Sequence, residues 1–195
     1  LPTVLDQCTG TDLFGRQGAI MAAGSVVSAL INISDVDWDL RDGGPESDSL
    51  RTRVCGLPAQ LRASGLLRGL GNDLMRTALN DFVRDLSRVR RPLPLSGAEL
   101  TAWQALLDDN LLNPDEKIRT GAADAFRALC GAYYACGREK DEQTDGRTNS
   151  YFPGLIERYL KLLRGTKVEM ERQGAALALG SLPRAAFEDP KRFDQ

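Results

Sequence analysis

One seven-residue pattern recurs along the chain and restricts the fold more than any other feature. Its clear copies are RQGAIMA at 16–22, RTGAADA at 119–125 and RQGAALA at 172–178, and a weaker copy begins at Arg76. The leading arginines are 60, 43 and 53 residues apart. These intervals approach a period of about 40–47 residues once two polar inserts are discounted, which favours a stack of helical hairpins of the HEAT or armadillo type. An ordinary helical bundle can also contain Gly-Ala-rich helices and stays open as the alternative.

Apolar residues recur every three or four positions over nearly the whole chain, as they do on one face of a helix. No run alternates apolar and polar residues in the manner of a half-buried strand. Pro92 and Pro94 follow one predicted helix. Ser96 and Glu99 have the spacing of a capping box, and Pro114 is expected in the first turn of a later helix. The sequence therefore predicts an all-α protein with helices at about 3–8, 12–33, 48–66, 71–89, 97–111, 115–136, 151–164 and 168–181.

Two polar inserts interrupt these helices, at about 35–48 and 138–149, and both are expected to be loops. The chain begins with Leu1 rather than Met and shows no signal-peptide pattern, so we expect a piece of a larger protein. Residues 1–195 are then a single α-solenoid segment of about eight helices. The four cysteines show neither a CxxC pair nor a regular spacing, which is typical of reduced thiols in a cytosolic protein.

The chain contains no histidine, and this absence excludes several classes of enzyme. Without imidazole there is no Ser-His-Asp or Cys-His nucleophile and no zinc site that requires histidine. The formal net charge of −2 gives no positive field that would attract nucleic acid or an anionic membrane. No uninterrupted apolar run approaches the roughly 20 residues that cross a bilayer. We therefore expect no enzyme activity, no bound cofactor or metal, and neither a nucleic-acid nor a membrane partner.

Three motifs resemble functional sites but have simpler explanations. The loop at 35–46 places acids at positions 1, 3, 5 and 12 of a calcium-binding pattern, yet position 6, which requires glycine, is Leu40. Residues 68–72 lack the remaining positions of a phosphate-binding loop and are expected to form a turn between helices. The carboxylate pairs at 108/109 and 169/171 diverge on their helices and are expected to be solvated. Trp103, which lies among leucines, is expected in the core.

The four recurring arginines, Arg16, Arg76, Arg119 and Arg172, are the candidate contacts with a partner protein. Two interpretations are open for them. Each arginine can reach an acid or a carbonyl in a neighbouring turn and so stabilise the stack, or it can contact the partner. Trp38, in the acidic insert, is a candidate of another kind, either an anchor for a partner or a local packing residue. No residue pattern indicates a catalytic group.

Four segments of the chain match the pattern of one known family in the same order. Residues 5–19 resemble the segment LDQ-x-TGTDLF-x-RQGA, and residues 68–76 resemble the element RGLG-x-x-LMR. Two further matches lie at 128–134 and 177–183. These segments are similar to those of the tubulin-specific chaperone D family, also called tubulin folding cofactor D. The TGTDLF-x-RQGA match is specific, whereas the ALALG-type match alone would mean little in a helical repeat.

The resemblance implies a large HEAT-repeat protein of the cytosol that acts after the chaperonin step of tubulin folding. Members bind β-tubulin, and they work with other tubulin cofactors and an Arf-like small GTPase to assemble or take apart the αβ-tubulin heterodimer. The assembled machinery promotes GTP hydrolysis by tubulin, and no catalytic residue of the family maps onto this chain. A generic α-solenoid scaffold or transport adaptor is the alternative. An enzyme or a calcium sensor is disfavoured by the missing histidine and by Leu40.

Overall fold

The computed structural model describes residues 1–33, 45–134 and 151–187, apart from the side chains of 45–49, 151–153 and 185. The helices within these ranges are α1 (Pro2–Gln7), α2 (Leu13–Ile33), α3 (Pro45–Ala63), α4 (Asn72–Ser87), α5 (Gly97–Leu111), α6 (Glu116–Leu129), α7 (Tyr151–Gly165) and α8 (Glu169–Ser181). A π-helical turn (Cys130–Tyr134) continues α6, and a 3-10 turn (Arg184–Phe187) follows α8. The described ranges contain no strand. The prediction of an all-α protein with about eight helices is confirmed.

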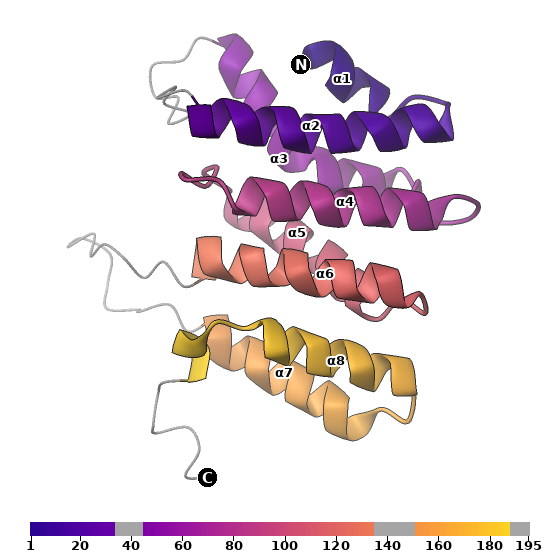
Figure 1. Cartoon of the computed structure of the whole chain (residues 1–195), viewed down its shortest axis with the longest axis vertical. Helices are drawn as coiled ribbons and strands as arrows, with labels where there is room; N and C mark the ends of the chain where they lie inside the picture. Colours follow the sequence, from indigo (N-terminus) through magenta and orange to yellow (C-terminus); the bar gives the residue numbers. More distant parts are fainter. Residues whose placement is uncertain (34–44, 135–150, 188–195) are drawn as a thin grey trace, which may run out of the picture.

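The helices lie in two layers (Figure 1). Helices α2, α4, α6 and α8 form one layer, which we call the front layer, and each of them packs against the next. Helices α1, α3, α5 and α7 lie behind it. The turns that join α3 to α4, α5 to α6 and α7 to α8 lie along one edge of the molecule, on the right in the figure. The first turns of the front-layer helices, and with them the recurring arginines, are therefore found along this edge.

The observed helix starts follow from their capping residues. The Ser96 side chain accepts a hydrogen bond from the N–H of Glu99, and the Glu99 carboxylate accepts one from the N–H of Ser96, so the capping box before α5 is confirmed. The Asp115 carboxylate caps α6 by accepting hydrogen bonds from the N–H groups of Lys117 and Ile118. Pro114 thus precedes the cap, and the expectation that it lies in the first turn of this helix is wrong.

The first polar insert is shorter than the sequence predicts. Helix α3 begins at Pro45, so residues 45–48 are helical instead of forming a loop. Proline is well suited to the first position of a helix, because its missing N–H would have no partner within the helix. Residues 35–44, with Trp38, Leu40 and most of the calcium-like pattern, lie outside the described residues, and so does the whole insert at 138–149.

A continuous apolar core fills the space between the layers. Trp103 is fully buried in it, with ring centroids 6.0 Å from Phe82 and 6.4 Å from Tyr133. Its indole Nε1 donates a hydrogen bond of 2.8 Å to the carbonyl oxygen of Cys55, so that its one polar group is satisfied inside the core. The expected place of Trp103 in the core is confirmed.

The described cysteines are free thiols buried in the same core. Burial removes water that would stabilise a thiolate, and it raises the pKa of Cys8 to about 11 and the pKa values of Cys55 and Cys130 to about 12. The prediction of unpaired cysteines is confirmed for these three residues, and Cys136 lies outside the described part of the chain.

Among the described helices, α2 is long and apolar enough to cross a membrane by length and composition alone. The expectation that the chain has no such segment is therefore too strict. Core helices of soluble proteins meet the same criterion, and α2 buries Ile20, Ala23 and Val27 in the core.

Candidate functional site

Arg16 and Arg119 make the same pair of hydrogen bonds at the starts of α2 and α6. Arg16 Nη1 donates to the carbonyl oxygens six and five residues earlier, at 2.7 and 3.0 Å. Arg119 Nη1 donates to the carbonyl oxygens at the same two positions before it, at 2.8 and 2.7 Å. Each guanidinium therefore holds the turn that precedes its own helix, through charge-assisted hydrogen bonds.

Arg76 occupies the corresponding position in α4 and belongs to a buried polar network. Its Nη2 donates to the carbonyl oxygen of Leu67 at 3.2 Å, and its Nη1 donates to the side-chain oxygen of Asn110. Asn110 donates to the side-chain oxygen of Asn80 at 2.8 Å, and Asn80 donates to the carbonyl oxygen of Ile118 at 3.1 Å. Both asparagines are buried, so this network ties α4 to α5 and α6 with satisfied amide groups.

Arg172, at the start of α8, differs from the other three arginines. Its side chain is exposed and makes no hydrogen bond or ion pair with any residue in the described ranges. The stabilising interpretation accounts for Arg16, Arg76 and Arg119, whose bonding partners are carbonyl and amide oxygens rather than acids. Contact with a partner stays a prediction for Arg172. The structure does not describe Trp38, the remaining candidate.

A groove of about 590 Å³ lies between α6 and α8 in the front layer. Arg119 Nη2 donates a 3.0 Å hydrogen bond to the side-chain oxygen of Gln173 and so bridges the two helices at this groove. Gly180 has no side chain to fill the space, while Leu177 and Arg127 line it. Arg127 is exposed and has no side-chain partner in the part of the chain that the structure describes. Within the described residues, the groove therefore presents a cation without a side-chain partner next to apolar surface.

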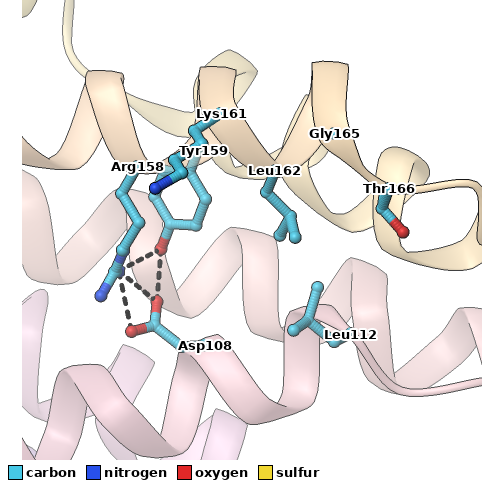
Figure 2. Close-up of a pocket in the computed structure, with 8 residues that line it drawn as sticks. All are labelled: Asp108, Leu112, Arg158, Tyr159, Lys161, Leu162, Gly165 and Thr166. Carbon is cyan, nitrogen blue, oxygen red and sulfur yellow. Dashed lines mark hydrogen bonds and ion pairs between the residues drawn. The ribbon is translucent and has the colours of Figure 1, made fainter.

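Asp108, Arg158 and Tyr159 form a polar cluster between α5 and α7 (Figure 2). Arg158 Nη2 lies 2.8 Å from each carboxylate oxygen of Asp108, and the Tyr159 hydroxyl donates to the same carboxylate. Burial raises the pKa of Asp108 in spite of these two donors. The expectation that the 108/109 pair is solvated is therefore wrong for Asp108, because α7 covers it. Asp109 is half-exposed and pairs with Arg62 at 2.8 Å.

The sequence patterns missed the buried asparagines and the Asp108 cluster. Asn80 and Asn110 stand where helical spacing places the apolar face, and a polar residue at such a position is the signal that could have indicated a buried network. Asp108 gave no comparable signal, since its partners Arg158 and Tyr159 lie on a helix 50 and 51 residues later in the chain.

Within the described ranges, no group of three or more aspartate, glutamate, cysteine or histidine side chains could hold a metal ion. No protein-family model matches the chain, and no solved structure matches it. The candidate site is thus defined by its own geometry. It consists of two exposed arginines without a side-chain partner among the described residues, Arg127 at the groove between α6 and α8 and Arg172 at the start of α8.

Proposed function

We propose that the chain is part of an α-solenoid in a tubulin folding cofactor and that its helical surface binds β-tubulin. With other tubulin cofactors and an Arf-like small GTPase, such a protein assembles and takes apart the αβ-tubulin heterodimer in the cytoplasm, where it serves the microtubule cytoskeleton. In this proposal the chain performs no bond chemistry itself. It supports GTP hydrolysis by tubulin only as part of the complex.

The resemblance of residues 5–19 to the cofactor family carries the proposal. These residues form the end of α1, the following turn and the start of α2. The Asp12 carboxylate accepts a hydrogen bond from the N–H of Gly15 at the start of α2, and Arg16 holds the turn through two carbonyl oxygens. The aspartate and the arginine of the TGTDLF-x-RQGA segment therefore have a physical reason to stand at that spacing.

The repetition of one local arrangement supports the solenoid part of the proposal. Arg16 and Arg119 hold the turns before α2 and α6 in the same way, at the first position of the recurring pattern. In the copy on α8, a Cβ atom at Gly174 would lie 2.8 Å from the carbonyl carbon of Leu111, so the absence of a side chain lets α8 approach the turn between α5 and α6. Helical hairpins stacked in this manner offer an extended surface to a partner.

The proposal takes the exposed face of the front layer as the surface that binds tubulin. Arg127 and Arg172 on α6 and α8 are exposed cations without partners among the described residues. Phe14 and Met21 on α2 are exposed apolar side chains. Arginine together with large apolar side chains is typical of the residues that contribute most to protein–protein binding.

Retention of purified αβ-tubulin on the immobilised chain, detected with an antibody to β-tubulin, tests the proposal. The charge-reversed variant Arg172→Glu is compared with Arg91→Glu, an equal change of charge at an exposed position between α4 and α5. We expect the unaltered chain and Arg91→Glu to retain tubulin, and Arg172→Glu to retain less. If the chain retains no tubulin under low-salt conditions, the proposal is wrong. The alternative, an adaptor of the same architecture, is favoured if a different protein is retained instead.

A further inference from the structure

Helix α7 and the turn that follows it carry an excess of positive charge. Residues 151–167 contain the cations Arg158, Lys161, Arg164 and Lys167 and the single acid Glu157, a net charge of +3 in a chain whose formal net charge is −2. The arginines of α3 are also numerous, but ion pairs with acids of α1 and α5 occupy them, at Arg51, Arg53 and Arg62.

The cations of α7 differ in how they are paired. Arg158 is held by the Asp108 carboxylate and lies over the ring of Tyr159, with 4.9 Å between its guanidinium carbon and the ring centroid. Lys161 and Arg164 are exposed and have no side-chain hydrogen bond or ion pair with the described part of the chain. Lys167, in the turn after α7, is likewise exposed and has no side-chain partner in the described part of the chain, so the positive charge that remains available to a ligand is on these three side chains.

A pocket of about 580 Å³ opens between α7 and the C-terminal end of α5, and of these cations Lys161 lines it. Leu162 on α7 and Leu112 at the end of α5 lie on opposite sides of it, and the ring of Tyr159 and the stem of Lys161 complete its wall (Figure 2). Its volume is in the range of about 300–1,000 Å³ that is typical of pockets that bind ligands. The apolar lining selects an apolar group, and the neighbouring cations select negative charge close to it.

We infer that this pocket binds an acidic peptide segment with one large apolar side chain. The apolar side chain enters between Leu112 and Leu162, and carboxylates on the flanking residues of the peptide contact Lys161, which lines the pocket, and Lys167, which follows the lining residue Thr166. The half-buried Asp108 holds Arg158 at the rim through their ion pair, so that Arg158 is not available to the carboxylates of the peptide. This inference goes beyond the proposed function and stands independently of it, because it identifies the partner only by its chemistry.

The geometry favours a peptide over two other anionic partners. The pocket is recessed between two helices, whereas the cations without partners among the described residues lie on α7 and the turn after it, so a flat anionic membrane would reach these cations but not the apolar wall. Single-stranded nucleic acid stacks its bases on exposed aromatic rings, and Tyr159 is only 3% exposed. A peptide can place one narrow apolar side chain in the pocket while the carboxylates on its neighbouring residues contact the cations outside it.

Fluorescence anisotropy with three labelled synthetic peptides tests the inference on the whole chain. The first peptide has one phenylalanine between two runs of three glutamates, the second has glutamines in place of the glutamates, and the third has glycine in place of the phenylalanine. We expect the first peptide to bind, and the other two to bind about tenfold more weakly or not at all. Binding of the first peptide should weaken with added salt, because exposed charges are screened.

Two variants locate the binding at the pocket. Lys161→Glu is expected to weaken the first peptide by about tenfold, since the reversed charge replaces attraction with repulsion. Arg91→Glu, with the same change in charge, is expected to alter it by less than about twofold. Leu112→Ala, at a side chain that is 36% exposed, is expected to weaken the phenylalanine peptide and to leave any residual binding of the glycine peptide unchanged.

Several outcomes would overturn the inference. Equal binding of the glycine peptide would show that the pocket is not used, and equal binding of the glutamine peptide would show that the cations are not used. An unchanged affinity in Lys161→Glu would place the binding elsewhere. Binding to vesicles of anionic lipid that is lost in Lys161→Glu, without binding of any peptide, would identify a membrane surface as the occupant instead.

Discussion

Alanine at the glycine of the recurring pattern is expected to stabilise one helix and destabilise another. Gly18, Gly121 and Gly174 occupy this position in α2, α6 and α8. An added Cβ would meet nothing within 4 Å at Gly18, and it would lie 3.3 Å from the side-chain nitrogen of Asn80 at Gly121. At Gly174 it would collide with the backbone carbonyl of Leu111, whose carbon would be 2.8 Å away.

These contacts determine the magnitude of each effect. Alanine is favoured over glycine inside a helix by about 0.8–1 kcal/mol, so Gly18→Ala should raise the free energy of unfolding by about that amount. At Gly174 a carbon–carbon contact needs about 3.5 Å, so α8 would have to move by at least about 0.7 Å. Overpacking costs about 1–3 kcal/mol, and the nearest atom here is a backbone oxygen that cannot turn away. The net loss expected for Gly174→Ala is therefore about 2 kcal/mol, and Gly121→Ala should be close to neutral.

Urea unfolding followed by far-ultraviolet circular dichroism measures these differences. Gly180→Ala is the matched control for Gly174→Ala, because it lies on the same helix and its Cβ would meet nothing within 4 Å. It should stabilise α8 by about as much as Gly18→Ala stabilises α2. If Gly174→Ala is as stabilising as these two variants, α8 does not approach the turn between α5 and α6, and the account of the recurring pattern is wrong.

Three further predictions concern buried polar groups. Arg119→Ala should lower the free energy of unfolding by about 3 kcal/mol, because it removes three hydrogen bonds of a buried guanidinium. Arg172→Ala should change the free energy of unfolding by less than about 0.5 kcal/mol. Similar losses for the two variants in urea unfolding would contradict this difference. Burial raises the pKa values of the described thiols, at Cys8, Cys55 and Cys130. An aromatic disulfide reagent at mildly alkaline pH should therefore modify these thiols only when the chain unfolds, and peptide mapping of the native protein should find them intact. Because the pKa of Asp108 is raised, the folded state binds the proton of its carboxyl group more tightly than the unfolded state does. The free energy of unfolding of the unaltered chain, relative to that of Asp108→Asn, should therefore fall as the pH rises above about 4. A relative stability that increases over this range would refute the raised pKa of Asp108.

Local features of the sequence predicted most of the secondary structure. Periodic apolar residues placed the eight helices, and the capping box at Ser96 and Glu99 placed the start of α5. The predicted and observed positions of Pro114 differ because a proline near the start of a helix can stand either in the first turn or just before the cap. At α6 the carboxylate of Asp115 accepts two backbone hydrogen bonds and is the cap, so Pro114 precedes it. At the start of α3, by contrast, Pro45 is itself the first residue of the helix.

The candidate site was less accessible from the sequence, because it depends on contacts between distant segments. The recurring pattern identified Arg16, Arg119 and Arg172 as equivalent, but only the packing of the helices separates the two that hold turns from the one that is exposed. Likewise, the prediction that Asp108 is solvated was wrong because Arg158 on α7 contacts it, and no sequence pattern within α5 indicates that contact. Burial, more than residue type, distinguishes structural from available side chains here.

Hydrogen–deuterium exchange of the chain with and without saturating αβ-tubulin is the most direct test of the central claim, that this helical surface binds β-tubulin. The account predicts slower exchange in the front layer, above all in α6 and α8 around Arg127 and Arg172, with little change in the interior of α3 and α5. Unchanged exchange throughout the chain at saturating tubulin would contradict it.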